Sequence, residues 1–338
     1  MGQTFRRITP QLVTLALVVL LVTVFFPNFF AIGFDGTRFV GPVVDVLKRS
    51  APVALLGVGM TLVIATRGID LSVGTVMAIS GAVAAWAITS GYGLAGAVGL
   101  AIGAGLLAGL WNGCLVAIVG IQPIVATLIL MTSGRGIAQL ITEGRILTFS
   151  DPNLAFAGSG SVLGIPFPTI LWIATAVVVA LLMRRTALGM LIEATGINRA
   201  ASALAGVNAT VLLIAVYMAS GFCASLAGIV ATADIRGADA NNAGLWLELD
   251  AILAVVIGGN SLLGGRFSIA GTMIGALIIQ TINTGIMLSG FPSEYNLVIK
   301  AVLVLVILVL QSPNLAADWL FLKSLVKARR ANVRSETP

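Results

Sequence analysis

Long apolar runs separated by short polar connections fill most of the chain. The runs are unbroken, whereas a membrane barrel strand alternates apolar and polar residues. Only a backbone that satisfies its own hydrogen bonds can cross lipid, and a helix of about 20 apolar residues does so. The pattern therefore predicts ten spanning helices, over residues 11–30, 52–66, 71–88, 94–119, 123–142, 167–183, 209–232, 251–264, 269–289 and 297–311.

Two of these runs are short and interrupted. The run 52–66 stops at Arg67-Gly68-Ile69-Asp70 before apolar character resumes, and the run 251–264 is broken by glycines. Corresponding broken segments in two halves are typical of internally repeated transporters. We predict an all-α polytopic membrane protein with broken helices in two pseudo-repeated halves, forming a single transmembrane domain over residues 1–338.

Composition agrees with a membrane location. The chain has 338 residues, of which 58% are hydrophobic and 9% charged, with a mean hydropathy of +1.07. A soluble domain carries about 25% charged residues, so the apolar excess must face lipid. Cys114 and Cys223 lie inside apolar runs and are interpreted as buried residues. Histidine is absent, which argues against a metal-dependent enzyme and, more weakly, against proton coupling.

Positive charge is distributed unequally between the two predicted sides. Of the 19 lysines and arginines, twelve fall on the side of the N-terminus and five on the other. This bias predicts that both termini are cytoplasmic, with 312–338 as a basic cytoplasmic tail. Arg6 and Arg7 precede an uncleaved first span, and a twin-arginine export signal is the alternative. The basic residues form no reading face for nucleic acid, despite the net charge of +6.

Residues 184–208 form the longest internal polar segment on the predicted cytoplasmic side. Glycines divide it into one or two short helices. Such a helix at the membrane surface could transmit the conformational change of a soluble, energy-supplying subunit to the membrane helices. An ordinary amphipathic connector at the interface explains the segment equally well.

On the predicted outer side, residues 233–252 carry four acids, two asparagines and a tryptophan. Trp246, Asn241 and Asn242 fit a sugar-handling mouth, because sugars stack on aromatic rings and hydrogen-bond to amides. The acids are equally consistent with a solvated face.

A few polar residues lie at membrane depth, where such side chains are rare and often functional. Each could instead pair with a free backbone carbonyl beside a glycine break. These residues at membrane depth predict a polar path for neutral, hydrogen-bonding solutes; they are Asp70, Asn112, Arg135, Gln139, Gln280 and Asn283. The candidate substrate-pathway residues are Asp70, Asn112, Arg135, Gln139, Trp246 and Asn283.

Motifs for covalent chemistry are missing from the sequence. It contains no G-x-x-x-x-G-K-[ST] phosphate loop, no G-x-S-x-G elbow and no H-E-x-x-H site. We therefore predict no catalytic residue, no metal ligand and no cofactor bound by this chain.

Three segments carry a resemblance to a known family. TRGIDLSVGTVMAISG at 66–81, NGCLVAIVGIQPIVATLIL at 112–130 and ELDAILAVVIGGNSLLGGRFSIAGTMIGALI at 248–278 resemble the inner-membrane permeases of ribose-type ABC sugar importers. The resemblance covers nearly the whole chain, and the run ADIRGADANNAGLWLELDAILAVVIGG is most similar to galactofuranose permeases. Arg67 departs from the pattern, because most relatives have glycine there.

The resemblance implies a ten-helix permease of the bacterial inner membrane, paired with itself or with a sister permease. It also implies two ATP-binding cassette subunits, which hold ATP and Mg²⁺, and a periplasmic sugar-binding protein. Residues 184–208 match the coupling segment of the family. The implied ATPase contacts are Gly189, Glu193, Gly196 and Asn198.

The sequence therefore predicts a permease for galactofuranose or a related hexose that works by alternating access. Two alternatives remain open at this stage. One is a sugar facilitator that needs no motor, and the other is an importer of the same architecture for branched-chain amino acids.

Overall fold

The apolar runs of the sequence form helices in the computed structural model, which describes residues 2–290 and 295–311. The chain divides into two units, Met1–Leu288 and Ser289–Pro338. The helices are α1 (Gly2–Phe25), α2 (Pro42–Ala65), α3 (Val73–Thr89), α4 (Gly93–Cys114), α5 (Pro123–Ile141), α6 (Pro152–Ser159), α7 (Phe167–Arg185), α8 (Leu188–Ile197), α9 (Arg199–Leu204), α10 (Ala209–Ile235), α11 (Leu247–Ile257), α12 (Ile269–Leu288) and, in the second unit, α13 (Asn296–Gln311).

Short elements complete the fold. A 3₁₀ turn, η1 (Pro27–Phe30), follows α1, and a π-helical turn, η2 (Leu115–Val119), ends α4. Three antiparallel pairs join β1 (Gly33–Phe34) with β2 (Phe39–Val40), β3 (Leu147–Thr148) with β6 (Gly237–Ala238), and β4 (Ser161–Val162) with β5 (Ile165–Pro166).

Each of the ten predicted spans overlaps a helix, so the prediction of an all-α polytopic protein is confirmed. Among the described residues, seven helices are long and apolar enough to cross a membrane. The helices α3, α11 and α13, with 17, 11 and 16 residues, are shorter. The internal repeat and the single domain over 1–338 stay predictions, and the basic tail 312–338 lies outside the described residues.

Two predicted boundaries differ from the structure. The second helix begins at Pro42, ten residues before the predicted run. The charged residues Asp45, Lys48 and Arg49 interrupt the apolar pattern of its first turns, and Pro42 suits a first helical position because its missing amide is not needed there. The predicted run 251–264 is helical only as far as Ile257. Gly259 then adopts a positive φ of 82°, a left-handed conformation that ends the helix.

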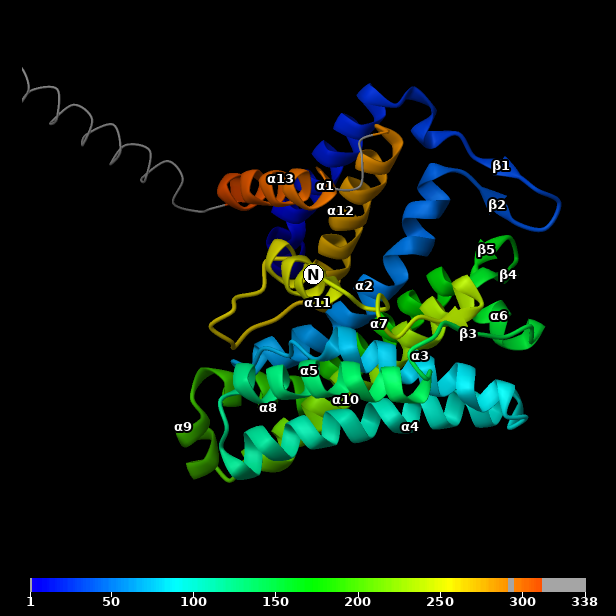
Figure 1. Ribbon diagram of the computed structural model, residues 1–338. Helices are drawn as coiled ribbons and strands as arrows, with labels where there is room; N and C mark the ends of the chain where they lie inside the picture. Colours follow the sequence, from blue (N-terminus) through cyan, green and yellow to red (C-terminus); the bar gives the residue numbers. More distant parts are fainter. Residues whose placement is uncertain (1, 291–294, 312–338) are drawn as a thin grey trace, which may run out of the picture. The chain divides into compact units, whose positions relative to one another are not determined.

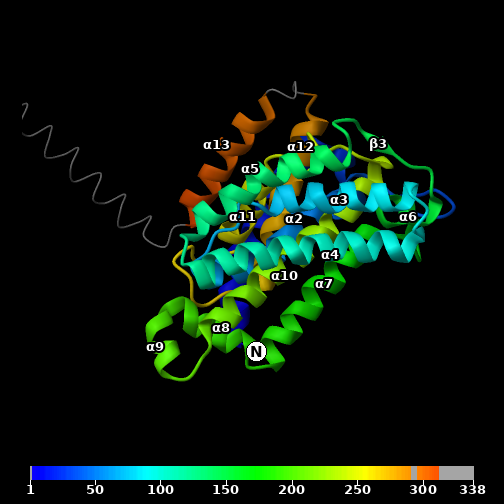
Figure 2. The same ribbon diagram turned by 60° about the horizontal axis from the view of Figure 1, so that its bottom comes forward.

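The centre of the first unit is a set of closely packed helices. Figures 1 and 2 both show α4 lying alongside α10. Three glycines lie at the crossing: Gly105 and Gly109 on α4 and Gly221 on α10. The two helix backbones are in direct contact there, and a Cβ at any of these glycines would meet the facing main chain. Small residues at this spacing allow such close approach in lipid, where no hydrophobic force joins helices.

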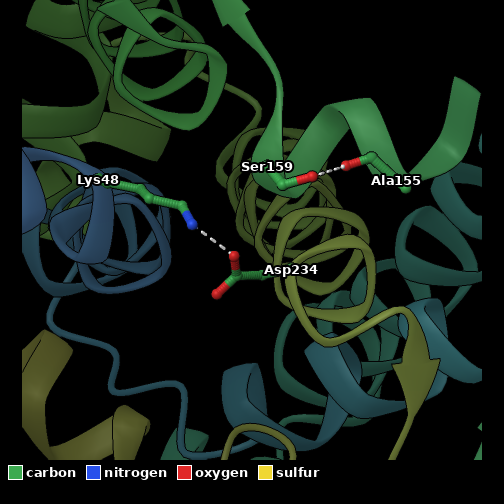
Figure 3. Close-up of polar contacts among 4 residues, drawn as sticks. All are labelled: Lys48, Ala155, Ser159 and Asp234. Atoms are coloured by element: carbon green, nitrogen blue, oxygen red, sulfur yellow. Dashed lines mark hydrogen bonds and ion pairs between the residues drawn. The ribbon is translucent and has the colours of Figure 1, made fainter. Parts of the chain in front are cut away.

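One end of this unit carries α6 and the short strands, and the other carries α8 and α9 (Figures 1 and 2). At the first end Lys48 of α2 pairs with Asp234 of α10, with Nζ 2.6 Å from Oδ1. Figure 3 shows this pair beside α6, where the Ser159 hydroxyl donates to the Ala155 carbonyl at 3.0 Å. The helix α6 packs its Gly158 against the backbone at Asp234.

The helix α6 was not predicted from the sequence, although it has a clear start signal. Asp151 precedes Pro152, and its Oδ1 accepts hydrogen bonds from the amides of Asn153 and Leu154, both at 2.9 Å. An aspartate cap followed by proline is a common helix start. The segment was missed because the search followed apolar runs, and α6 is too short to appear as one.

Candidate functional site

The first polar site lies where the chain breaks between α2 and α3. Ala65 ends α2, Arg67 takes a left-handed φ of 64°, and Val73 begins α3. Gly68 is buried against Tyr217 of α10, whose hydroxyl oxygen would lie 2.8 Å from a Cβ at that position. Non-helical backbone at membrane depth is tolerated where protein surrounds it, as here.

Asp70 lies at the centre of this break and is 3% exposed. Its Oδ1 accepts hydrogen bonds from the Ser72 amide (3.1 Å) and the Ser72 hydroxyl (2.6 Å). Its Oδ2 accepts one from the Ser220 hydroxyl of α10 at 2.8 Å. The Asn112 side-chain amide of α4 donates to the Ser72 hydroxyl oxygen at 2.8 Å. Asp70 thus bonds to Ser72 at the start of α3 and to Ser220 of α10, and Ser72 extends the network to Asn112 of α4.

The structure therefore brings together two of the predicted pathway residues, Asp70 and Asn112, with Ser72 between them. Sequence reasoning missed Ser72, Ser220 and Tyr217. Ser220 and Tyr217 lie three residues apart on one face of α10, which is a polar signal on an otherwise apolar helix.

The second break separates α11 from α12 and is organised by an amide. Asn260, 6% exposed, donates from Nδ2 to the Val255 carbonyl and to the Thr272 hydroxyl, both at 3.0 Å. Its Oδ1 accepts from the Ser268 amide at 2.6 Å. The Thr272 hydroxyl also lies 2.7 Å from that of Thr61 on α2. This break is thus linked to the helix that leads into the first one.

The two breaks meet through their backbones at one end of α2. The Gly265 amide donates to the Ala65 carbonyl at 2.9 Å, and Arg67 Nε donates to the Leu263 carbonyl at 2.8 Å. Gly196 of α8 packs onto the same place, where a Cβ would collide with the Ala65 carbonyl oxygen and crowd the Gly265 amide. The segment 184–208 therefore contacts both breaks directly.

At the opposite end, a loop between β6 and α11 is fixed onto α5. Arg135 donates from Nη1 to the carbonyls of Ala240 (3.0 Å) and Ala243 (2.6 Å). Gln139 donates from Nε2 to Asn241 Oδ1 at 2.7 Å. The predicted residues Arg135 and Gln139 thus hold the predicted mouth in place.

The same loop contains Trp246, which is 51% exposed with a left-handed φ of 66°. Asp239 shapes the turn by accepting from the amides of Asn241 and Asn242 and from the Asn242 side chain at 2.8 Å. The Asn242 side-chain hydrogen bond, with smaller help from Arg135, holds the pKa of Asp239 below its usual value. Glu248, in the predicted outer segment, is 4% exposed and lies in the first turn of α11 rather than on a solvated face.

Asn283 of α12 is the predicted pathway residue that lies apart from these groups. In the described part of the chain its Oδ1 is buried without a hydrogen-bond partner. Gln280, three residues before Asn283 on the same helix, donates to the Thr284 hydroxyl at 3.5 Å.

The predicted coupling segment folds into the two short helices α8 and α9, as expected. Gly189 and Gly196 are buried, and a Cβ at Gly189 would collide with the Met183 carbonyl of α7. Asn198 is exposed and caps α9 by accepting from the Ala201 amide at 3.0 Å. Glu193 lines a cavity of about 610 Å³, together with Arg184 and Arg266.

Several of the cations group at the two ends of the first unit. Arg67, Arg184, Arg199 and Arg266 line cavities around α8. At the other end, Lys48 pairs with Asp234, Arg145 pairs with Glu143, and the Arg236 carbonyl accepts from Phe149.

Comparison with known proteins identifies the family. A family model described as branched-chain amino acid transport system / permease component matches residues 43–308. The chain is 59% identical to the galactofuranose transporter permease protein of Escherichia coli K12, over 90% of this chain and 89% of that protein. It is 41% identical to the fructose import permease protein of Bifidobacterium longum, over 92% and 90%, and 39% identical to the ribose import permease protein of E. coli K12, over 87% and 90%. No solved structure matches.

Proposed function

This chain belongs to the family of branched-chain amino acid transport system permease components, and we propose that it is the membrane subunit of an ATP-driven importer for galactofuranose or a related hexose. The observation that carries the proposal is the 59% identity over most of both chains to a galactofuranose permease. The relatives at 41% and 39% identity are named as fructose and ribose import permeases, which supports a sugar as the substrate of this chain.

The polar groups of the chain support a neutral, hydroxyl-rich substrate. Hydroxyl and amide groups surround the two breaks, and serines hydrogen-bond both oxygens of the buried carboxylate of Asp70. A sugar needs paired donors and acceptors rather than a counter-charge. In our proposal Asp70, Asn112 and Asn283 border the path at depth, while Arg135, Gln139 and Trp246 shape its outer mouth.

Transport requires energy from outside the chain. We propose that two ATP-binding cassette subunits, holding ATP and Mg²⁺, dock against residues 184–208, where Glu193 and the exposed Asn198 offer polar contacts. Gly189 and Gly196 let α8 lie directly on α7 and α2. A change of state needs differential interaction energy, which ATP binding and hydrolysis would supply through α8. A second permease and a periplasmic sugar-binding protein complete the assembly.

The proposed orientation places α8 and α9 on the cytoplasmic side of the bacterial inner membrane, with both termini cytoplasmic. A cysteine at Ala194 should resist a membrane-impermeant thiol reagent applied to intact cells and react after permeabilisation. A cysteine at Leu163, on the opposite end and 93% exposed, is the matched control that should label from outside. Labelling of the Ala194 position from outside would reverse the orientation.

The substrate is tested with the assembled transporter in lipid. We expect galactofuranose, presented by the binding protein, to stimulate ATP hydrolysis, and omission of the binding protein to abolish that stimulation. Stimulation by ribose but not by galactofuranose would overturn the substrate. Uptake that excess leucine inhibits and sugars do not would favour the amino-acid importer, which the family description also covers. Uptake by the lone chain in vesicles would instead favour a facilitator.

A further inference from the structure

A cavity of about 270 Å³ lies at the α8–α9 end of the molecule, beside the first break, which contributes Thr66, Arg67 and Gly68 to its lining. The end of α2, the start of α5 and the helices α8, α9 and α10 contribute to its wall. Its lining includes two arginines, Arg67 and Arg199, and no carboxylate. The wall is therefore positively charged.

Both guanidinium groups have donors to spare. Arg67 uses Nε on the Leu263 carbonyl at 2.8 Å, and Arg199 uses Nη2 on the Ala117 carbonyl at 3.4 Å. Neither forms an ion pair within the described residues. The nearby carboxylate of Asp70 is not part of the lining, and serines hydrogen-bond both of its oxygens.

Two residues of the same lining, Tyr217 and Thr195, carry buried hydroxyls. Tyr217 is 0% exposed and Thr195 is 4% exposed. Within the described residues, the hydroxyl oxygen of each is buried without a hydrogen-bond partner. A buried polar group without a partner is costly, so two of them in one wall point to a ligand that hydrogen-bonds to both.

The start of α5 adds a third kind of donor. Gln122 and Pro123 line the cavity, and no side chain caps this 19-residue helix. The first amides of a helix have no partner within it, and the helix dipole favours negative charge at that end.

We propose that this cavity binds a phosphate group, either of a soluble phosphate ester or of a phospholipid head. Arg67 and Arg199 supply charge, Tyr217 and Thr195 donate hydroxyl hydrogen bonds, and the start of α5 completes the shell. Two guanidiniums with free donors suit a tetrahedral dianion or monoanion better than a neutral sugar. Beside the cavity, Ile118 and Val119 are 66% and 65% exposed, so acyl chains would have apolar surface to follow. The site does not depend on which solute is transported.

The test uses the purified full-length chain in a neutral detergent, with thermal unfolding followed during titration with inorganic phosphate against chloride at equal ionic strength. A ligand that binds only the folded state raises its stability with concentration. We expect saturable stabilisation of the wild type. Arg199→Gln and Tyr217→Phe should each weaken the apparent affinity by about tenfold, as expected for a lost charged or buried hydrogen bond.

Two features of the variants separate a ligand site from a structural role. Tyr217→Phe removes a hydroxyl that has no hydrogen-bond partner in residues 2–290 and 295–311, so the unfolding temperature without phosphate should not fall. Arg185→Gln, an exposed arginine outside the cavity, is the matched control and should titrate like the wild type. Equal weakening by Arg185→Gln, or unchanged affinity in both cavity variants, would overturn the site.

A lipid arm distinguishes the two sources of phosphate. Nanodiscs with phosphatidylglycerol are compared with nanodiscs of phosphatidylcholine, and retained lipid is detected by native mass spectrometry. Retention of phosphatidylglycerol that Arg199→Gln abolishes would identify a lipid head. Phosphate stabilisation without retained lipid would identify a soluble ester. No stabilisation and no retention in the wild type would refute the proposal.

Discussion

Each of the two breaks in the helical bundle is held by a buried polar side chain, but the two side chains differ in chemistry. Between α2 and α3 a carboxylate, Asp70, accepts three hydrogen bonds, whereas between α11 and α12 a neutral amide, Asn260, both donates and accepts. Both side chains are almost fully buried, at 3% and 6% exposure. Losing a donor leaves a buried carboxyl oxygen of Asp70 unsatisfied, which costs more than weakening an amide that keeps its other hydrogen bonds. The first break should therefore be the more sensitive of the two.

The largest effect is expected where both breaks meet α8. Gly196→Leu would place a side chain against the Ala65 carbonyl and the Gly265 amide, which are backbone groups with little room to move. We expect a loss of about 3 kcal/mol or more, since overpacking typically costs 1–3 kcal/mol and backbone cannot rotate away. Unfolding in mixed detergent–dodecyl sulfate micelles measures it. Gly206→Leu is a less crowded comparison, with open space around its Cβ direction but a positive φ of 89°. A smaller loss for Gly196→Leu than for Gly206→Leu would contradict the close packing.

Removing one donor from the carboxylate comes next. Ser220→Ala leaves Asp70 Oδ2 without its 2.8 Å hydrogen bond. A buried acceptor left unsatisfied costs about 1–3 kcal/mol, so the free energy of unfolding should fall by about that amount. Ser225→Ala is a matched control on the same helix, because its buried hydroxyl bonds to the Phe222 carbonyl of its own helix α10 rather than to a carboxylate. Equal losses of stability in the two variants would contradict the prediction that the hydrogen bond to Asp70 contributes more than one to a backbone carbonyl.

The neutral break should respond less. Thr272→Val removes the hydroxyl that contacts Thr61 and accepts from Asn260, while keeping the shape of the side chain. A neutral hydrogen bond contributes about 1 kcal/mol, so a loss of about 1–2 kcal/mol is expected by the same unfolding assay. A loss greater than that of Ser220→Ala would reverse the ranking of the two breaks.

The smallest effect is expected far from either break. Lys48→Met removes the ion pair with Asp234, whose side chains are 26% and 46% exposed. Exposed pairs of this kind contribute about 1 kcal/mol or less, and salt screens them. The unfolding free energy of this variant should approach that of the wild type as salt is raised. A salt-independent loss above that of Thr272→Val would show that the end of α2 is held more firmly than either break.

The helices were predictable because lipid demands long apolar runs, and a run of that length has few alternatives. Asp70 and Asn112 were predictable because a polar side chain within such a run is rare. Ser72 and Ser220 were not, since serine is common in membrane helices and usually bonds to its own backbone. Asn260 was hidden by its polar, glycine-rich surroundings. Gly196 was named from the family resemblance, but its contact with Ala65 and Gly265 joins positions that are distant in sequence and needed the structure.

That contact at Gly196 has a mechanical consequence. Where side chains separate two elements, their rotations absorb small displacements before the neighbouring main chain responds. Here no side chain lies between α8 and the last carbonyl of α2, nor between that carbonyl and the Gly265 amide. A small displacement of α8 would therefore move the main chain at Ala65 and at Gly265 together, because no side chain can rotate to absorb it.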